Sequence, residues 1–229
     1  MTTNNEVYAM LKVIFISVVF TVLTACATTK TSFPAKSSDG MDLMPNSKMA
    51  AWYMKPGADL SEYDKIALLD TYVSFAKRCQ QNYNETASFQ DQVSDKDMQK
   101  IRDKVAKEFA AEMTKVLSTE DGRPMVSAGG TGVLILRPAI INLEISAPDL
   151  MTPGMSETYV ASAGSMTLYM ELFDGKTGDI IGRIIDPEAE DDAGMMQISS
   201  SVTNTADFDR IVKRWAQILN GHLADVSKN

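Results

Sequence analysis

A cluster of carboxylates is the part of the sequence richest in groups that bind metal ions. Asp186, Glu188, Glu190, Asp191 and Asp192 follow one another closely along the chain. Carboxylate oxygens are the ligands that Ca²⁺ and Mg²⁺ prefer in proteins. The spacing matches no known cation loop, however, and a solvated run of charge is the more ordinary interpretation. These residues are therefore weak candidate metal ligands in a predicted acidic loop.

A second chemical feature is Cys26, the last residue of the stretch Leu23–Cys26. The apolar run Val13–Leu23 precedes it, with Lys12 as a positive flank. This run is too short to span a bilayer as a helix, which needs about 20 apolar residues, but it suits a signal-peptide core. The arrangement resembles a bacterial lipoprotein signal, in which cleavage falls between Ala25 and Cys26 and the thiol receives a diacylglyceryl group. The alternative is an ordinary secretory signal with an incidental cysteine.

This signal sets the expected domain organisation and location. We expect a signal peptide over residues 1–25, a lipidated N-terminus and flexible tether over 26–48, and one folded domain over 49–229. Ala27 after the cysteine resembles an outer-membrane sorting signal. The sequence thus predicts an outer-membrane lipoprotein anchored in the bilayer through acylated Cys26, with its domain facing the periplasm. Translation can begin at Met1 or at Met10, which starts a more compact signal.

Net charge narrows the range of partners. The chain has 229 residues and a formal charge of −8, which argues against nucleic-acid binding and against electrostatic adhesion to anionic lipid. Membrane attachment must then come from the acyl chains, in which each buried methylene contributes about 0.8 kcal/mol. An unidentified envelope protein is the other expected partner.

Two further residues have reactive side chains. If Cys26 is lipidated, Cys79 has no intramolecular disulfide partner. Lys77 and Arg78 beside it favour a thiolate, whereas a buried, inert thiol is the more ordinary interpretation. His222 is the only histidine, and acid–base catalysis would need an oriented partner and a substrate pocket. The sequence shows neither, and it shows no cofactor motif, so we expect no catalytic residues and no cofactor.

Periodicity predicts the elements that must position these residues. Residues 65–75 are expected to form one strand and residues 80–92 a polar loop. Ser94 and Asp97 form an acidic capping box before a helix whose apolar positions recur through Val116. A strand region follows over 133–145. A hairpin pairs residues 166–173 with 180–185, and residues 195–199 are a possible short strand.

The last predicted helix begins near Thr205 or Asp207 and has a continuous apolar face with Trp215 at its middle. We expect Trp215 to be a core anchor, with His222 near the edge of that face. A helix between the first strand and the next favours parallel pairing, whereas later strands join through short connections. The predicted fold is α+β: a mixed sheet of four or five strands with two long amphipathic helices on one face.

Five short segments form a recognisable set: Ala163–Leu168, Leu172–Ile181, Lys55–Leu60, Tyr63–Lys65 and Gly132–Leu134. In these segments the chain resembles a bacterial lipoprotein family of unknown function, domain of unknown function 3313. The resemblance runs from about residue 52 to the last helix and implies a single domain in the envelope. The family brings no catalytic residues with it.

Three classes of function remain open. The first is a non-enzymatic envelope lipoprotein whose domain docks on a periplasmic or outer-membrane partner. The second is a module that binds a small ligand or a divalent cation through the acidic residues. The third, with the least support, is an enzyme, because no nucleophile motif, metal-ligand cluster or cofactor fingerprint is present in the sequence.

Overall fold

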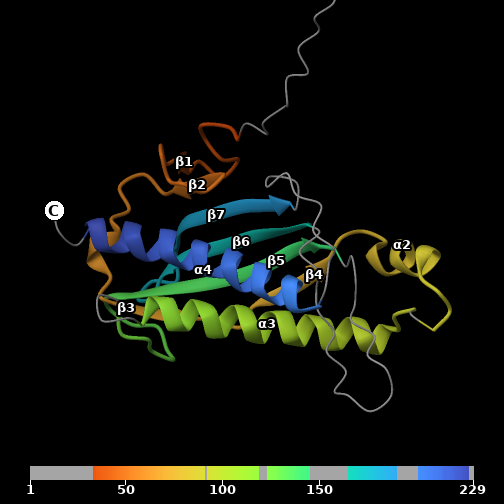
Figure 1. Ribbon diagram of the computed structural model, residues 1–229. Helices are drawn as coiled ribbons and strands as arrows, with labels where there is room; N and C mark the ends of the chain where they lie inside the picture. The colour runs from red at the N-terminus through yellow and green to blue at the C-terminus, as the bar shows by residue number, and fades with distance from the viewer. Residues whose placement is uncertain (1–32, 91, 119–122, 145–164, 190–200, 227–229) are drawn as a thin grey trace, which may run out of the picture. The chain divides into compact units, whose positions relative to one another are not determined.

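One mixed sheet of seven strands organises the computed structural model, which describes residues 33–90, 92–118, 123–144, 165–189 and 201–226 (Figure 1). Its strand order is β1-β2-β7-β6-β5-β3, and β4 also pairs with β5. The strands are β1 (Asp42–Leu43), β2 (Ala51–Met54), β3 (Lys65–Leu68), β4 (Tyr72–Phe75), β5 (Val133–Leu143), β6 (Ser165–Asp174) and β7 (Ile180–Ala189). The α+β class is confirmed. The predicted count of four or five strands is wrong, because strands as short as β1 and β2 contain too few residues to show an alternating pattern in the sequence.

The predicted strand over residues 65–75 is divided into β3 and β4, which both run parallel to β5. Leu68, the last residue of β3, and Tyr72, the first of β4, are four residues apart. Their partners in β5, Leu136 and Ala139, are only three residues apart. The extra residue interrupts the ladder in the manner of a bulge. The predicted parallel pairing is therefore confirmed, but as two strands.

Helix α3 (Asp95–Leu117) is the crossover between these strands and β5. Its predicted capping box is confirmed: Ser94 Oγ accepts a hydrogen bond from Asp97 N, and the Asp97 carboxylate accepts one from Ser94 N. Its buried positions follow the helical repeat: Met98, Ile101, Val105, Phe109, Met113 and Leu117. Helix α2 (Cys79–Thr86) corrects the prediction of a loop there, and a short 3₁₀ helix, η1 (Leu60–Glu62), precedes β3.

The hairpin of β6 and β7 is confirmed, and β7 is longer than predicted. The Asp174 carboxylate accepts hydrogen bonds from the backbone of Lys176 and Thr177, which fixes the turn. β7 continues through Ala189, so Asp186 and Glu188 lie in a strand and not in the predicted acidic loop. Pro187 is paired with Thr167 of β6, but it lies beyond Ile185, where the pairing of β7 with β2 ends. On that side β7 is an edge strand, which is where prolines occur in sheets.

Both long helices pack on one face of the sheet, as predicted. Helix α4 (Ser201–Val226) lies beside α3 across the strands (Figure 1). Alternate sheet residues such as Met170 and Ile184 join the buried helix residues Phe109 and Trp215 in one core cluster. Trp215 has no exposed surface, so its predicted role as a core anchor is confirmed.

Residues 33–48 lie in the range predicted to be a flexible tether, and the structure shows them folded. Leu43 of β1 pairs with Tyr53 of β2, and Met41 is buried with Ala51 and Tyr53 on the face of the sheet opposite the helices. Tyr53 Oη donates a hydrogen bond to the Pro34 carbonyl at 2.8 Å. The folded part therefore begins before residue 49.

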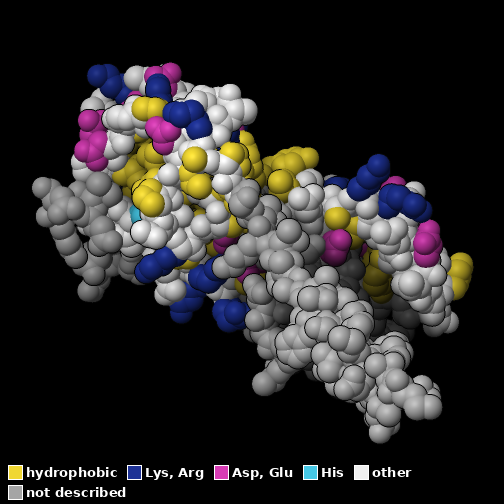
Figure 2. Space-filling model, turned by 90° about the horizontal axis from the view of Figure 1, so that it is seen from above, with side chains coloured by type: hydrophobic (Ala, Val, Ile, Leu, Met, Phe, Trp, Pro, Cys, Tyr) yellow, Lys and Arg dark blue, Asp and Glu magenta, His cyan; other side chains and the backbone are white. Residues whose placement is uncertain are grey.

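Figure 2 shows one face of the molecule, on which positively and negatively charged side chains are interspersed and the histidine is visible.

Candidate functional site

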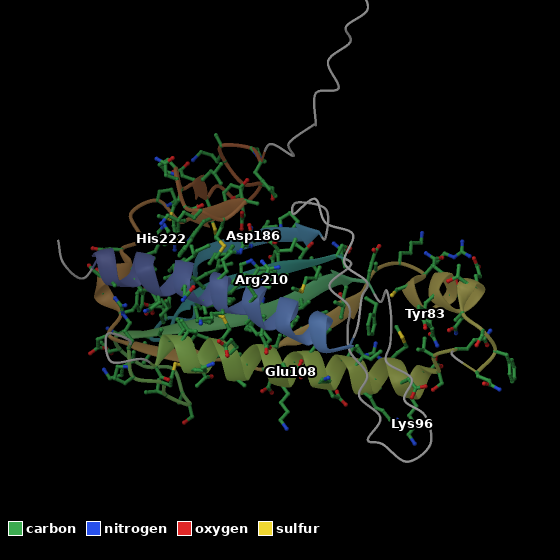
Figure 3. All side chains as sticks on the ribbon, in the orientation of Figure 1. Tyr83, Lys96, Glu108, Asp186, Arg210 and His222 are labelled. Carbon is green, nitrogen blue, oxygen red and sulfur yellow. The ribbon has the colours of Figure 1, made fainter. Side chains whose placement is uncertain are left out.

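Asp186 is the candidate metal ligand that the structure places most clearly, and its carboxylate is enclosed by hydrogen-bond donors. It is only 4% exposed and lies between β7 and α4 (Figure 3). Oδ1 accepts a hydrogen bond from the Ala50 backbone N–H at 2.6 Å. Oδ2 accepts from Trp215 Nε1 at 2.6 Å and from Arg214 Nη2 at 2.9 Å. These donors compensate the cost of burying the charge, and they occupy the oxygens that a metal would need.

The other acidic candidates give no metal cluster within the described part of the chain. Glu188 accepts a hydrogen bond from the same Nη2 of Arg214. Glu190, Asp191 and Asp192 lie outside the described residues, as do Ala25 and Cys26. Among residues that the structure describes, no three histidine, cysteine, aspartate or glutamate side chains form a metal-binding group. Asp186 and Glu188 are thus counter-ions of Arg214.

His222 packs between a buried ring and its own helix. Its imidazole lies 4.7 Å from the Trp52 ring, centroid to centroid, with a tilt of 41°. Nδ1 is 2.9 Å from the Ile218 carbonyl oxygen. Because a carbonyl only accepts, Nδ1 carries the proton in that contact, and Nε2 is the nitrogen left for other partners.

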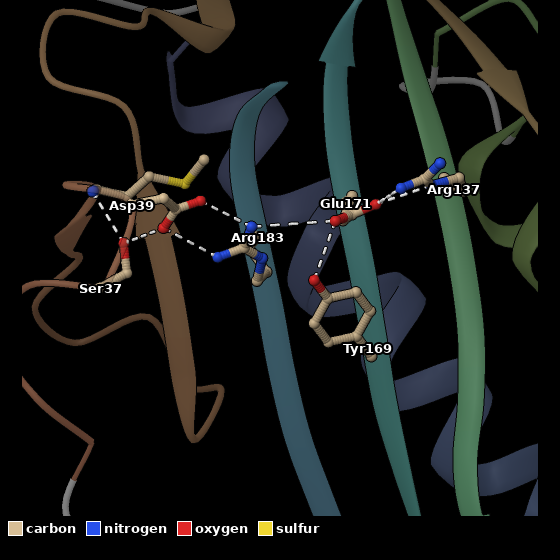
Figure 4. Close-up of polar contacts among 7 residues, drawn as sticks. Ser37, Asp39, Arg137, Tyr169, Glu171 and Arg183 are labelled. Carbon is tan, nitrogen blue, oxygen red and sulfur yellow. Dashed lines mark hydrogen bonds and ion pairs between the residues drawn. The ribbon is translucent and has the colours of Figure 1, made fainter. Parts of the chain in front are cut away.

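A row of alternating charges crosses the sheet on the face opposite the helices, which we call the outer face (Figure 4). Arg137 of β5, Glu171 of β6 and Arg183 of β7 are direct cross-strand partners. Arg137 donates from Nε and Nη2 to Glu171 Oε2, with 2.8 Å from Nε. Arg183 donates from Nη1 and Nη2 to the two carboxylate oxygens of Asp39, at 3.1 and 2.8 Å. The row therefore holds the segment before β1 against the sheet.

Aromatic side chains flank this row. Tyr169 Oη donates to Glu171 Oε1 at 3.0 Å, and the guanidinium of Arg137 lies 5.0 Å from the centroid of the Phe173 ring. Tyr72 stands on the same face, since its β5 partner Ala139 is also the partner of Tyr169. Tyr72 is 65% exposed. The β4–β5–β6 part of the outer face thus presents aromatic and cationic groups to solvent.

Contacts in and beside the charge row shift the pKa values of Asp39, Tyr169 and Arg183. The Arg183 guanidinium, assisted by the Ser37 hydroxyl, holds the pKa of Asp39 well below its usual range. The hydrogen bond to Asp39 in turn raises the pKa of Arg183. Burial, together with the hydrogen bond to Glu171, raises the pKa of Tyr169. These groups therefore keep their usual charge states at neutral pH, as positioning elements of a fixed surface.

Sequence reasoning did not single out this row. The alternation of polar and apolar residues in β6 was visible, and it placed Glu171 on the same face as Tyr169. The pairing of Glu171 with Arg137 could not be predicted without the strand register. The pairing of Arg183 with Asp39 joins residues that are 144 positions apart in the sequence.

Cys79 is buried at the start of α2. This agrees with the more ordinary interpretation of this cysteine, a buried thiol.

Comparisons with known proteins give one family and weak structural likenesses. The chain matches no curated protein. It is similar to a putative lipoprotein from Caulobacter crescentus CB15, at 14% identity and a TM-score of 0.32, over 72% of this chain and 90% of that one. It is also similar to PelC dodecamers from Paraburkholderia phytofirmans in two crystal forms. These are 13% and 12% identical, each with a TM-score of 0.31 over 71% of this chain, and over 95% and 96% of theirs.

Within the described residues, no helix has both the length and the hydropathy needed to cross a membrane.

The family assignment rests on one match that covers most of the chain. The model of the family described as "Protein of unknown function (DUF3313)" matches residues 37–219. The chain therefore belongs to this family.

Proposed function

We propose that this protein is a non-enzymatic lipoprotein of the cell envelope, anchored in the outer membrane through acylated Cys26, whose domain binds another envelope protein in the periplasm. The observation that carries the docking role is the exposed part of the outer face around Arg137, Tyr72 and Tyr169. Tyrosine and arginine are the residue types enriched where protein partners bind.

The outer face is organised before a partner arrives. Two hydrogen bonds to Glu171 fix the Arg137 guanidinium, while its side chain remains 58% exposed. A side chain that is already ordered loses less conformational freedom on binding, which favours affinity. A complementary partner would present an apolar patch to Tyr72 and Tyr169 and a carboxylate to Arg137.

The cation-binding alternative has less support from the geometry. Arg214 donates to Oδ2 of Asp186 and also binds Glu188, while the Ala50 N–H donates to Oδ1 of Asp186. A divalent ion would have to displace that guanidinium from a buried carboxylate. A calorimetric titration with Ca²⁺ tests this alternative, and a stoichiometric heat of binding would favour it over the docking role.

Photo-crosslinking in living cells tests the docking role. A benzoylphenylalanine at position 72 or 169 should form a discrete adduct of higher mass on irradiation, and Arg137→Ala should reduce its yield. The matched control is the same probe in place of Lys107, which is exposed on α3. Equal adducts from position 107, or none from positions 72 and 169, would show that the outer face is not the docking surface.

A further inference from the structure

A second surface, on the helix side of the sheet, holds a recess of about 330 Å³. Asn46 and Lys48 line it from the loop between β1 and β2. The residues that line it from α4 recur along one stripe of that helix: Arg214, Gln217, Ile218, Gly221 and His222. Ligand sites of small molecules begin at about this volume. The recess is therefore large enough for a small ligand.

The loop that forms one wall has an unusual backbone. Asn46 and Lys48 have φ values of 58° and 61°, a region that lysine rarely adopts. Contacts around Lys48 hold it there: Ser47 Oγ hydrogen-bonds the backbone of Met49 across it, and Ala50 N donates to Asp186. A non-glycine residue fixed in this region is a form of strain that concentrates at functional sites.

The opposite wall presents an anchored guanidinium. Nη2 of Arg214 donates to Asp186 and Glu188. Its Nε and Nη1 groups have no hydrogen-bond acceptor among the described residues, although Arg214 lines the recess. Arginine carries five N–H donors in a rigid fork, so the contacts of Nη2 also restrict the positions of the remaining donors.

The remaining polar groups of the recess are also unused. Within the described part of the chain, no hydrogen bond or ion pair engages the side chains of Asn46, Lys48 or Gln217. Neither Asp186 nor Glu188 lines the recess. Besides Gly221 and the apolar Ile218, the residues that line it are thus a lysine, an arginine, an asparagine, a glutamine and a histidine, with no carboxylate among them.

We infer that this recess is a binding site for the oxyanion of a small molecule, a phosphate group bound between Lys48 and Arg214. Lysine and arginine have no acceptor atoms, and their charge-assisted hydrogen bonds to oxyanions are about twice as strong as neutral ones. The phosphate is either free or part of a lipid headgroup, since both offer the same oxygens. This site goes beyond the proposed docking function, and it lies on the other side of the sheet from the outer face. A negative result for phosphate binding therefore leaves the docking proposal unaffected, and the reverse also holds.

The single histidine makes the test specific. His222 is the only histidine of the chain, so histidine labelled with ¹³C at Cε1 gives one NMR signal, located in the recess. The full chain in detergent is titrated at constant pH and ionic strength with sodium phosphate, with sodium chloride, and with short-chain phosphatidylglycerol. We expect a saturable shift with phosphate and none with chloride. A shift with phosphatidylglycerol alone would identify the lipid headgroup as the source of the oxyanion.

Lys48 provides the decisive variant. Lys48→Gly removes the ammonium and accepts the positive φ, so the loop keeps its conformation. Loss of one charge-assisted hydrogen bond should weaken phosphate binding by about tenfold or more. Lys48→Asn, which also tolerates this φ, is the second variant, and Lys213→Ala on the exposed side of α4 is the control, with unchanged affinity. The inference is overturned if neither phosphate compound shifts the signal, or if affinity is unchanged in both Lys48 variants.

Discussion

The indole N–H of Trp215 donates a hydrogen bond to Oδ2 of Asp186 at 2.6 Å, which joins α4 to β7 inside the core. Both residues are almost completely buried. The same carboxylate holds the Ala50 backbone and Arg214, so one side chain connects three segments distant in sequence. A residue that the acidic run suggested as a metal ligand is therefore part of the structural core.

Truncation of Trp215 should have a large effect on stability. Trp215→Ala should lower the free energy of unfolding by about 3–5 kcal/mol, through lost burial and a cavity. Trp215→Phe keeps most of the volume and removes one hydrogen bond, so the loss should be about 1 kcal/mol. Urea unfolding followed by circular dichroism measures both. Lys213→Ala is the exposed control and should change stability by less than about 0.5 kcal/mol. Equal midpoints for Trp215→Ala and wild type would contradict the burial.

Asp186→Asn should also destabilise the protein, by about 1–3 kcal/mol. Both oxygens of Asp186 accept hydrogen bonds, and an amide replaces one acceptor by a donor that faces another N–H. Glu188→Gln, which alters the more exposed partner of Arg214, should cost less than about 1 kcal/mol. Thermal unfolding of the two variants compares them directly. An equal loss in both would mean that the buried carboxylate is no more important than the exposed one.

The Asp39–Arg183 ion pair predicts a loss of stability in acid. Because the pKa of Asp39 is lowered in the folded state, chiefly by Arg183, the pair contributes stability above the unfolded pKa of about 3.9. That contribution disappears as the pH falls through the lower folded value. Asp39→Asn should therefore have a lower urea midpoint than wild type at pH 7, and the difference should shrink below about pH 4.

The control for this titration is Asp70→Asn. Asp70 is exposed, and no hydrogen bond or ion pair engages its side chain within the described residues. Its urea midpoint should follow that of wild type from pH 7 to the acid limb. A difference between Asp39→Asn and wild type that is constant with pH would mean that the lost contact is not ionic.

The proposed membrane attachment is tested at Cys26, which lies outside the residues that the structure describes. Cys26→Ser should prevent acylation, so the protein should no longer incorporate a tagged fatty acid. Cys79→Ser keeps Cys26 and is the matched control, with labelling equal to wild type. Gel fluorescence after metabolic labelling measures both. Equal labelling of wild type and Cys26→Ser would show that Cys26 is not the acylated residue.

Local patterns were enough to predict much of the architecture. The capping box of Ser94 and Asp97 and the apolar repeat behind it define α3, because helix periodicity and capping depend on residues within a few positions. The same reasoning correctly predicted that Trp215 is buried and that the hairpin turn begins at Asp174. It failed where a strand was only a few residues long, as in β1 and β2, since so few residues carry no clear period.

The sequence by itself determined the two long helices, the hairpin and the parallel crossover, and it predicts a lipoprotein signal that ends at Cys26. Only the tertiary structure decided what the charged residues do. It paired Arg183 with Asp39, showed that Asp186 is a buried acceptor and not a metal ligand, and brought Lys48 and Arg214 to the lining of one recess. The physical reason is that these contacts join segments far apart in the chain. Which charges meet depends on strand order and register, and neither is encoded in the spacing of neighbouring residues.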